Sequence, residues 1–127
     1  MALTVEDLLA IGKRNLEAAR YNIEGGFADI GLSRAYYAMF HGASAALLSI
    51  GITPRTHAGV RTMFAQNFVK PGHIAVGYFE MYSYAFALRQ DADYSGRQLS
   101  LEEVQPHLEN AAAFIAEVRR FLSLPGD

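Results

Sequence analysis

The chain has 127 residues, of which 51% are hydrophobic and 19% are charged, and this composition excludes an intrinsically disordered chain. We expect a single domain over residues 1–127, because the chain is too short for two cores. Cysteine is absent, which excludes disulfides, thiolate nucleophiles and cysteine zinc sites. The net charge of −2 gives no overall basic excess of the kind that favours nucleic acid.

The N-terminal third of the chain predicts two long helices. Apolar residues recur every three or four positions after Thr4, and the pair Thr4 and Asp7 has the spacing of a capping box. Gly25-Gly26 is expected to end this first helix. A second helix is expected from about Asp29 to Ile50. It carries a stripe of small residues that would let another helix approach closely, namely Ala38, Gly42, Ala45 and Ser49.

A short third helix is expected next, with Thr53 as its N-cap and Pro54 at its first position. Pro71-Gly72 would close it. The core side of this helix is predicted from apolar residues at helical spacing, which are Val60, Phe64 and Phe68.

The C-terminal half predicts a fourth helix that unwinds near Asp91–Gly96, and a fifth helix that Ser100 and Glu103 cap. Pro106 lies inside the fifth helical pattern, so the helix either kinks there or begins there. No segment alternates as a strand does, and no apolar stretch is long enough for a membrane span. We therefore predict an all-α protein, an up-and-down four-helix bundle with one additional short helix.

Charge is unevenly distributed along the chain. No Asp or Glu occurs between Asp29 and Glu80, and the basic residues of that stretch are Arg34, Arg55, Arg61 and Lys70. A locally basic surface on an acidic protein suits an anionic ligand or an acidic partner. A mostly buried second helix with few positions for any charge explains the same pattern equally well.

Two stretches of the sequence resemble the HEPN family, named for higher eukaryotes and prokaryotes nucleotide-binding. One stretch is Ser33–His41, with the sequence SRAYYAMFH, and the other is Arg89–Tyr94, with the sequence RQDADY. Between them lie His57, Gly59 and Val60. The resemblance extends roughly from Leu8 to Leu122, with the motifs in the expected order. This ordered set is most typical of small stand-alone prokaryotic HEPN proteins.

The resemblance implies a helical bundle that forms a homodimer. It also implies a small nucleotidyltransferase protein as partner, often in a two-gene toxin–antitoxin module. Active members of the family are metal-independent ribonucleases that need no cofactor. They use an Arg followed by four to six residues and then a His, and two copies of this motif face a shared cleft in the dimer.

At the place of that motif the chain has Arg89, four intervening residues and then Tyr94, so the histidine is missing. A histidine with a pKa near 6.5 exchanges protons at neutral pH, whereas a tyrosine with a pKa near 10 is a poor base. Tyr94 would still donate a hydrogen bond or stack on a base, and Arg89 would still pair with phosphate. The departure therefore favours anion binding over cleavage.

A second Arg-to-His pair lies on the predicted second helix. Arg34 and His41 are seven residues apart, which is about two turns, so both project from one face with Tyr37 between them. If this helix packs beside the fourth helix, His41 would supply the proton-transfer group that Tyr94 cannot. This is an inference from the spacing and not from the resemblance.

Each of these residues also has a structural explanation. Arg89 and Asp93 are spaced to form an ion pair, and Asp93 with Tyr94 would anchor the following loop. His41 lies in an apolar helix, where a hydrogen-bonded core histidine is the ordinary case. Arg34 would pair with an acidic residue at a helix start, and His57 would sit in the opening turn of the third helix.

Two hypotheses remain open from the sequence. The first is a cytoplasmic HEPN domain that binds or cleaves RNA or a nucleotide, in a module with a nucleotidyltransferase. Its candidate catalytic residues are Arg89, Tyr94 and His41, and its candidate RNA- or nucleotide-binding residues are Arg34, Tyr37, Asp93 and His57. The second is a non-catalytic dimeric module that recognises a nucleotide or a partner protein at the same place. A weaker third hypothesis is a purely structural dimerisation unit.

Overall fold

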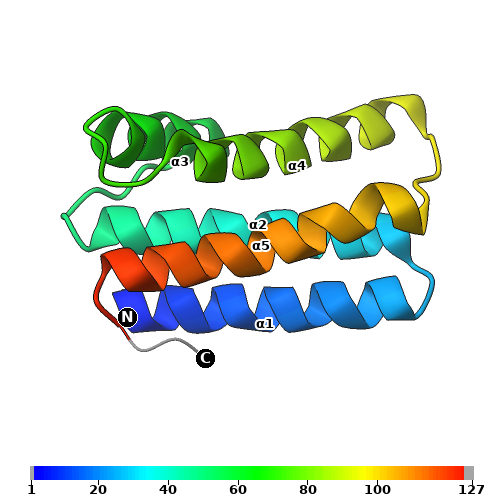
Figure 1. Cartoon of the computed structure of the whole chain (residues 1–127), viewed down its shortest axis with the longest axis horizontal. Helices are drawn as coiled ribbons and strands as arrows, with labels where there is room; N and C mark the ends of the chain where they lie inside the picture. The colour runs from blue at the N-terminus through cyan, green and yellow to red at the C-terminus, as the bar shows by residue number, and fades with distance from the viewer. Residues whose placement is uncertain (1, 125–127) are drawn as a thin grey trace.

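The computed structural model describes residues 2–124, and within that range it is all-helical with no strand. Four long helices are joined by short connections, and a short helix follows the second of them (Figure 1). The elements are α1 (Val5–Glu24), α2 (Ala28–Leu48), α3 (His57–Phe64), η1 (Ala65–Val69), α4 (Val76–Ser95) and α5 (Leu101–Phe121). The short π-helical turn η1 continues α3. The predicted all-α bundle with one extra short helix is confirmed.

Helix α2 forms the centre of the bundle. It contacts α1, α3, α4 and α5, and twelve of its 21 residues are buried. In Figure 1, α1 lies on one side of the α2 and α5 pair, and α3 with α4 lies on the other. The four long helices run alternately in opposite directions along the bundle, as predicted.

Small residues let the helices around α2 approach closely, as the sequence predicts. A Cβ atom built on Gly42 would lie 3.0 Å from Cδ1 of Ile115 on α5, and one on Gly12 of α1 would lie 3.1 Å from the same atom. Ala38 and Ala45 are fully buried, while Ser49 is exposed at the end of α2. The side chain of Ile115 thus fills the space that these glycines leave.

The predicted helix boundaries at both capping boxes are confirmed. In α1 the backbone N–H of Asp7 donates to the Thr4 hydroxyl at 3.0 Å, and the Thr4 N–H donates to the Asp7 carboxylate at 2.9 Å. Ser100 and Glu103 make the same reciprocal pair at the start of α5. Because α5 begins at Leu101, Pro106 lies inside the helix rather than at its start.

The expected start of the third helix is wrong by three residues. Thr56, not Thr53, is the N-cap of α3, and its hydroxyl accepts a hydrogen bond from the Gly59 N–H at 2.9 Å. Both threonines have the cap-forming side chain, and the later start sets Val60 and Phe64 into the core. This boundary places His57 at the first position of α3.

The expected unwinding of α4 near Asp91–Gly96 is also wrong, because the helix continues to Ser95. Gly96 ends it in the left-handed conformation, with φ of 66°, which glycine adopts without strain. Asp93 and Tyr94 therefore lie in the last turn of a helix and not in a loop.

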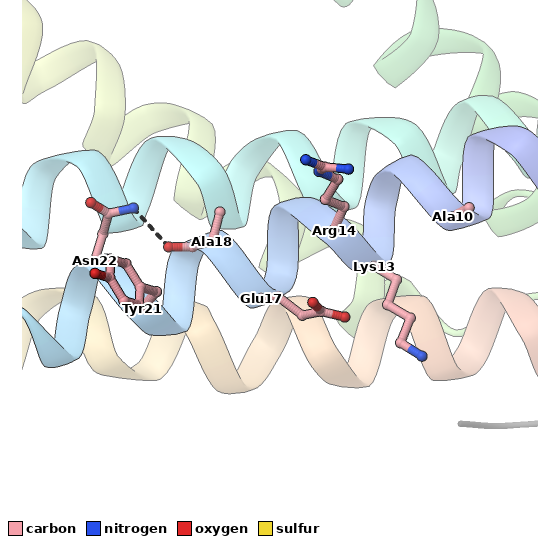
Figure 2. A pocket seen from close by; sticks show the side chains of 7 residues that line it. All are labelled: Ala10, Lys13, Arg14, Glu17, Ala18, Tyr21 and Asn22. Atoms are coloured by element: carbon pink, nitrogen blue, oxygen red, sulfur yellow. Dashed lines mark hydrogen bonds between the residues drawn. The ribbon is translucent and has the colours of Figure 1, made fainter.

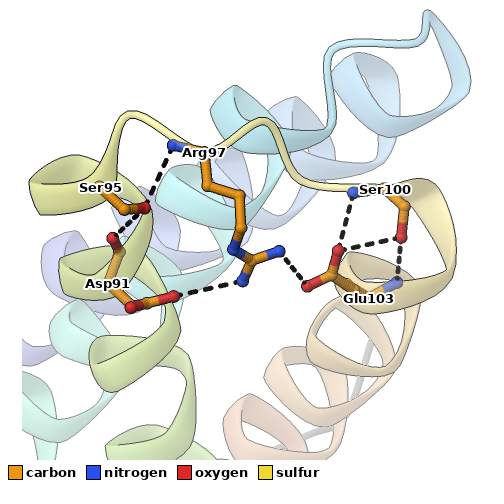
Figure 3. A network of polar contacts seen from close by, with 5 residues as sticks. All are labelled: Asp91, Ser95, Arg97, Ser100 and Glu103. Atoms are coloured by element: carbon orange, nitrogen blue, oxygen red, sulfur yellow. Dashed lines mark hydrogen bonds and ion pairs between the residues drawn. The ribbon is translucent and has the colours of Figure 1, made fainter.

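A polar network holds the junction of α4 and α5 and explains why the helix persists (Figure 3). The Arg97 guanidinium donates to Glu103 at 2.8 Å and to Asp91 at 3.3 Å. The Ser95 hydroxyl donates to the Asp91 carbonyl oxygen at 2.8 Å. The hydrogen bond from Arg97 holds the pKa of the Glu103 carboxyl below its ordinary value. These contacts provide hydrogen-bond partners for polar groups at the end of α4, and they join this end to the start of α5.

No helix in the part of the chain that the structure describes is long and apolar enough to cross a membrane.

Candidate functional site

Five of the candidate residues from the sequence meet around the ring of Tyr37 on α2, and we call this group the Tyr37 patch. Its members are Arg34, Tyr37, His41, His57 and Arg89. All five side chains are half-buried. They come from three elements, because α2 packs against both α3 and α4.

Two guanidinium groups lie against the Tyr37 ring. The Cζ atom of Arg34 is 4.9 Å from the ring centroid, and the Cζ atom of Arg89 is 5.2 Å from it. Arg89 also lies 5.3 Å from the ring centroid of the neighbouring Tyr36. Aromatic rings attract cations electrostatically, so these contacts hold the two guanidiniums in place. Arg34 has one further partner, the Asn15 side-chain oxygen on α1 at 3.1 Å.

Two histidines complete the patch. The His57 ring lies edge-on to Tyr37 with centroids 5.7 Å apart, and it stacks on Phe40 at 4.1 Å. The Nδ1 atom of His41 is 2.8 Å from the backbone carbonyl oxygen of Tyr37, so this nitrogen carries a hydrogen that it donates. This bond fits the structural explanation of His41. It occupies Nδ1 and leaves Nε2 as the nitrogen that a ligand would use.

The local electrostatics keep His57 neutral. Burial lowers the pKa of His57 below its ordinary value, and the nearby charges of Arg89, Arg61 and His41 lower it further. The Tyr36 hydroxyl lies 3.0 Å from Nδ1 of His57. Burial raises the pKa of Tyr36, with partial offset from Arg61 and Arg89, so this hydroxyl keeps its proton at neutral pH.

The structure adds two candidate residues to this region that the sequence analysis did not single out, Tyr36 and Arg61. Tyr36 looks like an ordinary core aromatic, and it is fully buried. The guanidinium of Arg61 stacks on Phe86 at 3.7 Å, and its Nη1 atom is buried without a hydrogen-bond partner. One feature of the sequence could have pointed to Arg61. Residues 30–79 contain no Asp or Glu, so Arg61 has no carboxylate nearby in the sequence.

No carboxylate neutralises this group of cations. Within residues 2–124, Arg34, Arg61 and Arg89 form no ion pair. The expected pairing of Arg89 with Asp93 is not formed, and Arg34 bonds to Asn15 instead of an acidic residue. Guanidinium groups without counter-charges attract an anion, and two of these three, Arg34 and Arg61, come from the stretch of the sequence that has no acidic residue.

Two candidate residues lie apart from the Tyr37 patch. Tyr94 is 90% exposed and makes no hydrogen bond or ring contact. It follows Arg89 by five residues, about 140° around the helix, so the two side chains leave α4 in different directions. Asp93 lines a polar hollow of about 470 Å³ together with Asp29 and Arg97. Two carboxylates in that hollow make it unsuited to a phosphate.

The residues of the Tyr37 patch are partly exposed, and they do not line the hollow that lies on α1. Figure 2 shows this hollow of about 690 Å³ on the outer face of α1, where Lys13 and Glu17 point to one side and Arg14 to the other. Its side chains diverge, which is unlike a ligand site with convergent polar groups. In the described part of the chain no group of three or more histidine or acidic residues is placed to hold a metal ion.

The chain belongs to the HEPN domain family, because residues 5–121 match that domain and the fold is the helical bundle that the resemblance implies. Two similar proteins of Methanocaldococcus jannaschii bear the names "Putative toxin MJ0605" and "Putative toxin MJ0142". Each is 34% identical over 93% of this chain, and the matches cover 88% and 81% of the two relatives. A UPF0332 protein of Gloeobacter violaceus is 29% identical over 94% of this chain and 90% of its own length.

Proposed function

We propose that this protein is a toxin-like HEPN protein that binds single-stranded RNA at the Tyr37 patch. The observation that carries the proposal is a set of three arginines without a carboxylate partner. Arg34 and Arg89 lie against Tyr37, and Arg61 lies against Phe86, the neighbour of Tyr36. Guanidinium groups bind phosphate oxygens in a bidentate manner, and aromatic rings support unstacked bases. The five side chains of the patch are partly exposed, so a polymer that passes across it could reach them.

The toxin-like part of the proposal draws on the relatives, two of which bear the name "Putative toxin". A toxin in a two-gene module requires a partner that restrains it, and the family resemblance makes a small nucleotidyltransferase the proposed partner. Exposed Tyr94 at the end of α4 is the side chain most accessible to such a protein among the candidate residues.

We also propose that the protein is a homodimer that uses α4. Only two of the twenty residues of this helix, Tyr82 and Ala85, are buried, whereas its exposed residues include Val76 and Tyr84. Exposed apolar side chains along one helix favour association with a second surface. A second copy on α4 would bring two Tyr37 patches to one cleft, because Arg89 lies on the same helix.

Mass measurement in solution tests the dimer. We expect twice the chain mass for the wild type and a single-chain mass for Tyr84→Glu, which adds a charge to the proposed interface. Tyr21→Glu is the matched control, since Tyr21 is 80% exposed and belongs to α1, which lies across the bundle from α4 (Figure 1). A monomeric wild type, or a dimer that Tyr84→Glu leaves intact, would contradict the use of α4.

Metal-independent cleavage of RNA is a second candidate function, favoured by the two histidines beside Arg89. In this reaction a base takes the proton of a 2′-hydroxyl, the 2′-oxygen attacks phosphorus, and the bond from phosphorus to the 5′-oxygen breaks. Arg89 would stabilise the charge that develops on the phosphoryl oxygens. The leaving 5′-oxygen takes its proton from a histidine or from water.

One assay separates the two functions. Wild type, Arg89→Gln and the control Arg20→Gln are incubated with mixed single-stranded RNA in the presence of a chelator. Arg20 is exposed and lines a groove between α1 and α5, away from the patch. We expect Arg89→Gln to weaken RNA binding by about tenfold or more, since a hydrogen bond to a charged group contributes about 1.5–3 kcal/mol.

Cleavage by the wild type that Arg89→Gln abolishes would establish the ribonuclease, and binding without cleavage would establish the binding module. The proposal fails if wild-type protein neither binds nor cleaves RNA, or if Arg20→Gln and Arg89→Gln weaken binding equally. Circular dichroism and thermal melting verify that each variant is folded.

A further inference from the structure

A second group of side chains adjoins the Tyr37 patch where α2, α3 and α4 meet. Tyr36 provides a buried hydroxyl, and His57 lies 3.0 Å from it through Nδ1. Arg61 lies against Phe86, whose ring centroid is 5.6 Å from that of Tyr36. Arg89 lies 5.3 Å from the Tyr36 ring centroid. We call these four residues, Tyr36, His57, Arg61 and Arg89, the Tyr36 subsite.

The hydrogen-bonding capacity of the subsite is incomplete. The Nη1 atom of Arg61 is buried and has no acceptor. An unsatisfied buried donor costs about 1–3 kcal/mol, and more on a charged group. Most buried polar groups in proteins have a partner, so this nitrogen calls for an acceptor from outside the chain. An anion that also reaches Arg89 would supply it.

The Tyr36 hydroxyl determines which nitrogen of His57 faces a ligand. That hydroxyl lies 3.0 Å from Nδ1 of His57, and in the described part of the chain it has no other hydrogen-bond partner. The hydrogen of Tyr36 is therefore free for Nδ1 of His57. A neutral His57 then carries its own hydrogen on Nε2, where it is available to donate to an anion.

The charges that surround His57 are all of one sign. They are His41 from α2, Arg61 from α3 and Arg89 from α4, and no acidic side chain acts on the ring. Such surroundings disfavour a second proton on the imidazole in the free protein. An anion placed between Arg61 and Arg89 would reverse the local field and favour that proton.

We propose that the Tyr36 subsite binds a phosphoryl group and that His57 takes up one proton from solvent when the anion binds. The proton enters at Nδ1, and the Tyr36 hydroxyl turns from donor to acceptor. His57 then holds the anion through Nε2–H as a cation. This inference rests on the proposed RNA binding and adds a ligand class and a pH dependence to it.

Anion binding is expected to depend on pH, because it is linked to the protonation of His57. In the free protein the pKa of His57 lies below its ordinary value of 6.5, and the bound anion raises it. Binding is therefore tighter at low pH and weakens as pH rises through the pKa of the complex. Between the two pKa values the affinity falls by up to about tenfold per pH unit.

The test is an NMR titration of the His57 ring, assigned by the signal that His57→Asn removes. It is carried out in chloride and in sulfate at equal ionic strength, because sulfate is an oxyanion that does not titrate in this range. We expect sulfate to raise the pKa of His57 and to leave that of His73 unchanged. His73 is exposed and makes no contact with the subsite, so it serves as the internal control.

Binding of 5′-hydroxyl and 5′-phosphoryl RNA is measured across the same pH range. Tighter binding of the 5′-phosphoryl RNA would assign the subsite to a strand end, and equal binding would assign it to an internal phosphodiester. In His57→Asn we expect RNA to bind with little pH dependence, while His73→Asn keeps the wild-type profile.

The inference is overturned if sulfate leaves the His57 titration unchanged, or if His57→Asn keeps the wild-type pH profile. Either result with intact RNA binding would leave the proposed function standing. RNA that fails to bind would instead remove the proposed function, and the sulfate titration would still decide whether the subsite takes an oxyanion.

Discussion

Replacing Arg34 and Arg89 together by glutamine is expected to lower the affinity for single-stranded RNA by about a hundredfold or more. Both guanidiniums lie against the Tyr37 ring, at 4.9 Å and 5.2 Å from its centroid, and neither has a carboxylate partner to release. Each charged hydrogen bond to phosphate contributes about 1.5–3 kcal/mol, so two lost contacts give an effect of this size. Fluorescence anisotropy with a labelled RNA measures it.

The salt dependence of binding gives an independent readout of the same variant. Each phosphate contact to a single strand adds about 0.7 to the slope of log affinity against log salt, so the double variant should lower that slope by about 1.4. The double variant Arg20→Gln with Arg120→Gln removes the same charge from exposed positions on α1 and α5. An equal loss of affinity in this control would mean that overall charge, and not the patch, attracts the RNA.

Gly31→Ala is expected to destabilise the fold by about 2 kcal/mol, as other overpacked core positions are. Gly31 is buried on α2 against α1. A Cβ atom there would overlap Cγ1 of Ile23, and it would lie 3.2 Å from the carbonyl oxygen of Ala19. Cγ1 of Ile23 is near the backbone, so α1 and α2 must separate to make room. Urea unfolding followed by circular dichroism measures the loss.

Gly77→Ala is the matched control for this prediction. Gly77 also lies in a helix, α4, and a Cβ atom built on it would meet nothing within 4 Å. Alanine favours the helix over glycine, so this variant should gain roughly 0.5–1 kcal/mol. Equal effects of the two substitutions would show that the close approach of α1 and α2 does not limit stability.

The helices were predictable from the sequence where the deciding signals are local. Both capping boxes, the small residues of α2 and the apolar side of α3 act within a few residues or one helix face. The two wrong boundaries depend on distant contacts. Thr53 and Thr56 are equally suitable N-cap residues by their side chains. The helix begins after Thr56 because that start places Val60 in the core. The polar run at the end of α4 resembles a loop, yet Arg97 and Glu103 hold it as helix.

The candidate site was partly predictable for the same reason. Helical periodicity places Arg34, Tyr37 and His41 on one face of α2, and the structure has them there. His57 and Tyr36 are 21 residues apart in the sequence, and their contact depends on how α3 packs on α2. Arg61 and Tyr36 gave no signal as single residues, because a lone arginine and a core tyrosine are ordinary features. Tyr94 remains a candidate by its exposure, outside the Tyr37 patch.

The sparse burial of α4 has a consequence for motion. Helix α4 has two fully buried residues out of twenty, and its other core-facing apolar side chains are only partly buried, whereas twelve residues of α2 are buried. Elements with less apolar burial open before the rest of a domain does. Backbone amides of α4 should therefore exchange with solvent faster than those of α2. Because Arg89 is carried on α4, whatever covers this helix also stabilises the position of that guanidinium, and assembly and ligand binding become energetically linked.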